Sequence, residues 1–85
     1  LEVTPVVARH KPDEVCLNFV LRDTATSVLY ATDTGWYGEP TWESLAGAAL
    51  DLAVLECGKG ISDNPYDGHL TLDDCVRFRA RLLDS

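Results

Sequence analysis

Four side chains of this 85-residue chain stand at junctions between an expected regular element and a loop. His10 follows an expected strand, and His69 lies just before an expected helix. Asp33 and Glu56 each close an apolar strand. Such junctions commonly carry functional groups, because a rigid scaffold holds the loop in place. Imidazole and carboxylate groups bind metals or transfer protons, so these are the two chemistries to weigh.

The two carboxylates are expected to lie together. If the strands that end at Asp33 and Glu56 are parallel neighbours, both residues reach the edge where open α/β sheets bind ligands. Adjacent carboxylates repel unless a cation or a shared proton offsets them, so this pairing favours a metal. For Asp33 alone, an Asx turn at the end of the strand is an equally good explanation.

The two histidines have both functional and structural interpretations. A histidine near a helix N-terminus is less readily charged, which suits His69 to general acid or base work near neutral pH. The alternatives are that His69 helps to cap the helix and that His10 is a surface residue without a role. The metal motif HxHxDH, a Gly-rich phosphate loop and GxSxG are all absent. Spacing alone therefore leaves the question of an enzyme open.

The hydrophobic pattern predicts an α/β fold with about four strands and two helices, in the order β-β-β-α-β-α. Strands are expected over 1–8, 15–22, 27–32 and 52–55. Pro5 places the first strand at an edge or bulge, and the second and third strands form a hairpin. The continuous apolar run 52–55 suggests a strand covered on both faces.

Both helices have start signals. Thr41 is the expected N-cap of the first helix. Thr71 and Asp74 resemble a capping box for the second. Trp42, Leu45 and Ala49 are expected on one face of the first helix, and the apolar stripe of the second is expected to comprise Leu72, Cys75, Val76, Ala80 and Leu83. The long loop over 57–70 is of a kind that is usually functional or mobile in so small a domain.

Two helices cover only one face of such a sheet, yet both faces are expected to be apolar. The face that needs a further layer comprises Val15, Leu17, Phe19, Val28 and Tyr30. The chain therefore reads as half of a two-layered sandwich.

Composition narrows the function classes. Fourteen acidic against seven basic side chains give a formal charge of −7, which opposes a broad nucleic-acid interface. No window has the length of a membrane span, and no signal-peptide pattern opens the chain. Cys16, Cys57 and Cys75 lack CxxC spacing, so reduced core thiols in a cytoplasmic protein are expected instead of disulfides or a Cys-based zinc site.

Five segments in this order resemble the C-terminal half of a metallo-β-lactamase-fold hydrolase. They are 6–10, the hairpin over 16–30, and the segments 30–35, 52–57 and 68–74. The branch containing ribonuclease Z and the phosphodiesterases of phosphonate breakdown is the most similar. The resemblance implies that residues 1–85 form half of a four-layer αββα sandwich, without its N-terminal half and its last strand.

The resemblance also implies roles for the four residues. His10 is then a metal ligand and Asp33 bridges two divalent ions, zinc or manganese. His69 is the proton donor to the leaving group, and Glu56 supports that histidine. Two such ions activate water and stabilise charge on a phosphoryl oxygen, so a small phosphodiester or a similar ester is the expected substrate. A nucleic-acid substrate stays open.

The HxHxDH motif of that family belongs to the absent half. We therefore expect the 85-residue piece alone to bind metal weakly and to be inactive. Its expected partner is that half or a second copy of the chain, and no membrane is expected. The alternative function is a non-catalytic interaction domain that dimerises through its exposed apolar sheet face.

Overall fold

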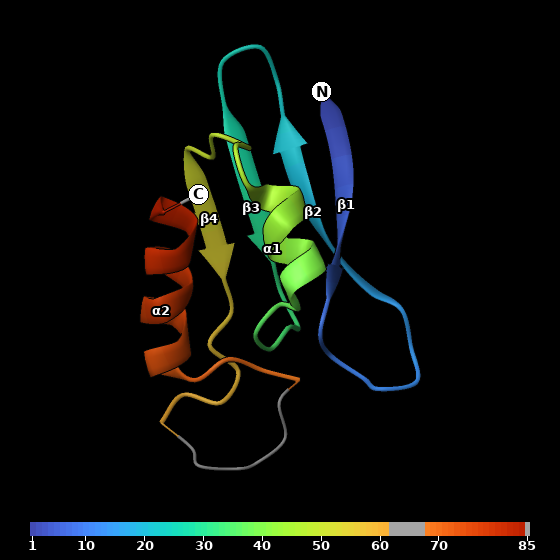
Figure 1. Ribbon diagram of the computed structural model, residues 1–85, viewed down its shortest axis with the longest axis vertical. Coiled ribbons are helices and arrows are strands. Elements are labelled where there is room, and N and C mark those ends of the chain that lie inside the picture. Colours follow the sequence, from blue (N-terminus) through green and yellow to red (C-terminus); the bar gives the residue numbers. More distant parts are fainter. Residues whose placement is uncertain (62–67, 85) are drawn as a thin grey trace.

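The computed structural model describes residues 1–61 and 68–84 as one four-stranded sheet and two helices (Figure 1). The strands are β1 (Glu2–Ala8), β2 (Cys16–Arg22), β3 (Ser27–Ala31) and β4 (Leu52–Leu55), and the helices are α1 (Glu39–Leu45) and α2 (Leu72–Leu83). The predicted α/β class and element order are confirmed. Of the expected loop 57–70, residues 62–67 lie outside the described part.

The sheet is mixed, with strand order β1-β2-β3-β4. β1 pairs with β2 and β2 with β3 in antiparallel fashion, which confirms the hairpin and places Pro5 on an edge strand. β4 pairs in parallel with β3, from Val28 opposite Leu52 to Ala31 opposite Leu55. Because β1, β3 and β4 run in one direction, their carboxyl ends meet at one edge, at the bottom of Figure 1.

The core lies between the helices and one face of the sheet. Its buried members are Val6, Val20, Leu29, Ala31, Tyr37, Trp42, Leu45, Leu70 and Phe78. Phe78 of α2 packs its ring 4.7 Å from the ring of Trp42 and 4.8 Å from that of Tyr37, measured between centroids. Aromatic pairs in tilted or edge contact add stability beyond their buried area. This aromatic cluster therefore joins α1, α2 and the segment that follows β3.

The buried face of β2 carries a polar residue, Asn18, which is 2% exposed. Its Nδ2 donates to the carbonyl of Thr32 at 2.8 Å, and the hydroxyl of Tyr37 donates to its Oδ1 at 2.6 Å. Burial raises the pKa of Tyr37, so its hydroxyl stays protonated. A buried amide is stable only when its hydrogen bonds are made, and these bonds let β2 turn Asn18 inward.

The start and end of α1 differ from expectation. Gly38 is the N-cap, and Pro40 stands in the first turn, where its fixed φ and missing N–H are tolerated. Thr41 is therefore inside the helix, and its buried hydroxyl donates to the carbonyl of Val7 at 2.8 Å. The helix ends at Leu45, so Ala49 does not share its face and instead has φ 53°.

The capping box of Thr71 and Asp74 is confirmed at the start of α2. The predicted apolar stripe is right for Cys75, which packs against the core with Leu82, but it omitted Phe78, the buried residue of the helix. This side of the helix meets the aromatic cluster, which the apolar count alone did not indicate. Leu72, Val76 and Leu83 are exposed. Val76 and Leu83 border a hollow of about 510 Å³ beside β4.

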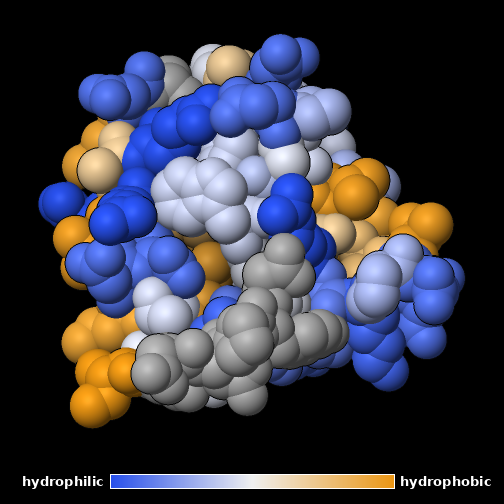
Figure 2. All heavy atoms as spheres, turned by 60° about the horizontal axis from the view of Figure 1, so that its bottom comes forward, coloured by the Kyte–Doolittle hydropathy of each residue, from blue (hydrophilic) through white to orange (hydrophobic). Residues whose placement is uncertain are grey.

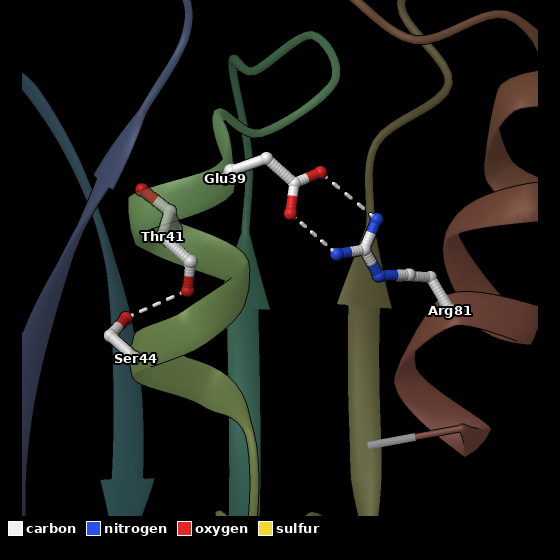
Figure 3. Close-up of polar contacts among 4 residues, drawn as sticks. All are labelled: Glu39, Thr41, Ser44 and Arg81. Carbon is white, nitrogen blue, oxygen red and sulfur yellow. Dashed lines mark hydrogen bonds and ion pairs between the residues drawn. The ribbon is translucent and has the colours of Figure 1, made fainter.

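An ion pair joins the two helices. Arg81 of α2 contacts both carboxylate oxygens of Glu39, at 2.8 and 3.2 Å (Figure 3). Its guanidinium also lies 5.0 Å from the ring centroid of Trp42. The hydrogen bonds to Arg81 lower the pKa of Glu39. Within α1, Ser44 donates to the carbonyl of Thr41 at 2.7 Å.

The opposite sheet face is apolar and open, as predicted. Cross-strand pairing aligns Pro5, Phe19, Tyr30 and Val54 in one row. Apolar side chains exposed along the strands of this face are Val3, Val7, Leu17, Phe19, Tyr30, Leu52 and Val54. β4 is therefore covered on one face only, which corrects the expectation of cover on both.

Candidate metal centre

The carboxyl ends of β3 and β4 bring three potential ligands together. One ligand atom each from Asp33, Glu56 and His69 lies within 4.8 Å of the others. The register of the parallel pair causes this, because Glu56 directly follows Leu55 and Asp33 comes two residues after the opposing Ala31. The predicted meeting of the two carboxylates at one edge is confirmed. Both carboxylates are exposed and His69 is half-buried.

Hydrogen bonds on both sides hold the turn that carries Asp33. Its N–H donates to Oε1 of Glu56 at 3.4 Å. The N–H of Arg9 donates to the buried hydroxyl of Thr34 at 3.0 Å, and the N–H of Gly35 donates to the carbonyl of Arg9. Asp33 itself has φ 49°, a left-handed conformation that aspartate tolerates better than most residues. The turn after β3 is thus tied to the segments after both β1 and β4.

His10, next to Arg9 in the segment after β1, lies beside His69. Its Nδ1 lies 3.1 Å from the carbonyl oxygen of Gly68, and its ring centroid lies 5.0 Å from that of His69. A carbonyl only accepts, so this bond requires the proton on Nδ1 and leaves the lone pair of the neutral imidazole on Nε2. A backbone carbonyl that fixes the ring in this way is the usual support of a metal-binding histidine.

The segment that carries His69 is paired with the chain that leaves β4. The N–H of Lys59 donates to the carbonyl of Leu70 at 3.0 Å, and that of Leu72 donates to the carbonyl of Gly60 at 2.7 Å. The capping box of α2 follows immediately. His69 therefore directly precedes a backbone pairing and a capped helix, both of which limit its movement.

The donor set has the chemistry of a divalent cation site. Carboxylate oxygens and imidazole nitrogens suit zinc and manganese alike. Without a cation, the negatively charged carboxylates of Asp33 and Glu56 lie close together and repel each other. The backbone N–H of Asp33 donates to Oε1 of Glu56 at 3.4 Å. Figure 2 turns this end of the molecule forward and shows hydrophilic side chains across its middle, between separate apolar patches. These residues fit a bound metal ion.

All four predicted site residues lie at this edge. Asp33, Glu56 and His69 form the described triad, and His10 contacts it through the ring of His69. The supporting role of Thr34 was missed. A small polar residue between the aspartate and a glycine was its only signal in the sequence.

The expectation of core thiols holds only in part. The three cysteines are free, but Cys57, next to Glu56, is exposed, and only Cys16 and Cys75 are partly buried. Burial, reinforced by the neighbouring thiol of Cys57, raises the pKa of Cys75 to about 11. Cys57 is exposed because β4 ends before it, so the strand no longer directs its side chain into the core.

A family model described as a beta-lactamase superfamily domain matches residues 1–84. The chain belongs to the beta-lactamase superfamily. The mixed sheet with its two helices is consistent with part of such a domain, which confirms the predicted fold. The match is to the superfamily as a whole and does not distinguish the ribonuclease Z branch. None of the curated proteins matches the chain.

Membership in the beta-lactamase superfamily gives the chain a hydrolase-type fold, in which bound metals are common. The triad at the carboxyl edge is a candidate site for such a metal. Among the described residues, no helix has the length and apolar character needed to cross a membrane.

Proposed function

We propose that this protein is part of a metal-dependent hydrolase that cleaves phosphodiesters or similar esters. The observation that carries the proposal is the convergence of ligand atoms from Asp33, Glu56 and His69 within 4.8 Å. Two divalent ions, zinc or manganese, would supply an activated water and charge stabilisation at the phosphoryl group. Superfamily membership supports hydrolysis as the reaction class.

The residues divide the work in this proposal. Asp33 offers a carboxylate to both ions, and His10 offers Nε2, because Gly68 holds the proton on Nδ1. His69 holds a proton for the leaving group, and the carboxylate of Glu56 keeps the imidazole oriented. The short distances within the triad also allow His69 to act as a ligand, and the test below separates these two roles.

We propose that the open apolar face is covered by another β layer of the same fold, either the N-terminal half or a second copy. The support is the row of exposed side chains that includes Phe19, Tyr30 and Val54. The N-terminal half would complete the four-layer sandwich and bring the HxHxDH motif that this chain lacks, whereas a second copy would cover the face without that motif. An uncovered apolar face of this extent is a liability in water.

We further propose a cytoplasmic setting, because the three cysteines are free. The formal charge of −7 favours a small ester over a long nucleic acid held by this chain alone. The open face equally suits the second candidate function, a non-catalytic domain that dimerises. Metal content decides between the two candidates.

The test is elemental analysis of the purified protein, followed by hydrolysis of bis(p-nitrophenyl) phosphate. We expect about two metals per chain once the fold is completed, as the two-ion mechanism requires. Asp33→Asn should remove metal and turnover together. His69→Gln should lower turnover by about 100-fold or more with metal retained if His69 is the proton donor.

Glu2→Gln is the matched control, since Glu2 lies at the opposite end of β1 and is exposed. Glu2→Gln should change neither the metal content nor the turnover. Loss of metal in His69→Gln would make His69 a ligand. Absence of metal from the completed wild-type protein would exclude the hydrolase and favour the dimerising domain.

A further inference from the structure

His69 lies against Gly58, in the segment that leaves β4. A Cβ atom added at Gly58 would lie 2.7 Å from Nδ1, 2.9 Å from Cγ and 3.0 Å from Cβ of His69. These distances are shorter than ordinary van der Waals contact. The imidazole of His69 thus occupies the place that any other side chain at position 58 would take.

Gly58 is needed for space and not for its backbone conformation. Gly47 and Gly60 have φ of +75° and +58°, and nothing lies within 4 Å of a Cβ added to either. Gly58 is outside that left-handed region. A methyl group at position 58 therefore meets no left-handed backbone, and the three atoms nearest to it all belong to His69.

Neither the segment that carries Gly58 nor the segment that carries His69 can move easily away from such a methyl group. Residues on both sides of the contact are joined by the bonds from Lys59 to Leu70 and from Leu72 to Gly60, at 3.0 and 2.7 Å. The conflict also reaches Cβ and Cγ of His69, so it cannot be relieved at the far end of the side chain alone. The ring would turn or shift as a whole, away from its place beside Asp33 and Glu56.

We propose that Gly58 is a positioning residue for His69: the absence of a side chain at position 58 leaves the space in which the imidazole stands beside the two carboxylates. The consequence for metal binding rests on the proposed function. The contact itself does not.

The experiment compares Gly58→Ala with Gly38→Ala in the full chain. Gly38 is the matched control, because its φ is −68° and a Cβ there meets only Cδ of Pro40, at 3.7 Å. The probe is Co²⁺, titrated by its visible absorption. Gly58→Ala should change the Co²⁺ absorption band, because the imidazole moves beside the carboxylates, and should weaken Co²⁺ binding by about tenfold or more where His69 is itself a ligand. Gly38→Ala should leave both within about twofold of wild type.

A double-mutant cycle with His69→Ala separates positioning from a general structural effect. If Gly58 acts through the imidazole, adding Gly58→Ala to His69→Ala should cause no further loss of Co²⁺ affinity. An equal loss in both backgrounds would overturn the proposal.

A measurement on the metal-free protein, the NMR spectrum of His69, does not depend on the proposed function. The imidazole ¹H resonances of His69 should move in Gly58→Ala and stay in place in Gly38→Ala. Unchanged His69 resonances in Gly58→Ala would overturn the positioning role. Wild-type protein that binds no Co²⁺ even after the N-terminal half of the fold has been supplied, with shifted resonances in Gly58→Ala, would refute the proposed function and leave the positioning role standing.

Discussion

The hydrogen bond between His10 and Gly68 determines which nitrogen His10 can offer. Because the Nδ1–H of His10 donates to the carbonyl of Gly68, only Nε2 carries a lone pair in the neutral ring. This bond spans 58 positions of the chain, between residues that follow β1 and precede α2. The nitrogen that His10 could offer to a metal is therefore set by a residue that no local pattern connects to it.

Two substitutions of His10 test separately its hydrogen bond to Gly68 and its proposed role as a metal ligand. Asparagine places a donor near the position of Nδ1, whereas glutamine reaches toward the position of Nε2. We expect His10→Asn to keep the stability of the fold and to weaken Zn²⁺ binding by about tenfold or more. His10→Gln should retain more of the binding and lose more stability. Calorimetric titration and urea unfolding measure the two, and equal metal affinity in wild type and His10→Asn would contradict the ligand role.

Ala49 provides a prediction about backbone strain away from the site. Its φ of 53° is unfavourable for a residue with a Cβ atom, by roughly 1–2 kcal/mol. Glycine removes that cost but gains freedom in the unfolded chain, so Ala49→Gly should raise the free energy of unfolding by about 0.5–1 kcal/mol. The control is Ala48→Gly, where φ is not positive and the same change should destabilise. Urea unfolding decides, and a loss of stability in Ala49→Gly would contradict the left-handed conformation.

At the scale of elements, the link between α1 and α2 gives a pH-dependent prediction. Arg81 lowers the pKa of Glu39 in the folded state, so the ion pair stabilises the fold above the ordinary carboxyl pKa. That contribution is lost as the pH falls through the folded-state pKa of Glu39. Glu39→Gln should therefore lower the melting temperature slightly at pH 7, and the difference should vanish in acid. A difference that persists at pH 2–3 would show that Glu39 acts other than through its charge.

The elements also show what the sequence could and could not predict. Alternation and β-branched runs located the strands, and the capping box located α2, because both signals are local. The stripe of α2 was misjudged, because Phe78 is buried by aromatic neighbours from α1 and the segment after β3. The start of α1 was misplaced because Pro40 signals a turn as readily as a first helical turn.

The candidate site was predictable to the extent that it follows from strand direction. A parallel β3–β4 pair brings Asp33 and Glu56 together whatever the loops do. The contact of His69 with Gly58 and the bond of His10 to Gly68 depend on how loops fold over one another. Such contacts depend on tertiary packing, which periodicity does not encode.

At the scale of the whole molecule, the open apolar face predicts self-association of this chain when no other layer covers it. Phe19→Asp places a charge in the row that includes Tyr30 and Val54, so it should weaken association by about tenfold or more, as measured by sedimentation equilibrium. Val76→Asp is the control, because Val76 belongs to α2, which covers the other face of the sheet, and is 63% exposed. A wild-type chain that stays monomeric at high micromolar concentration would contradict the prediction.

The span between His10 and Gly68 also bears on how the protein is made. During synthesis the chain emerges from its amino end, so His10 is available long before Gly68 and His69 have left the ribosome. Contacts so distant in sequence carry a high entropic cost of loop closure, which places them late in folding. The edge of the sheet with all four site residues is thus completed only when α2 has docked. A metal ion that needs all of these donors would bind late in folding, and its retention would report that the segments from β1 to α2 have assembled.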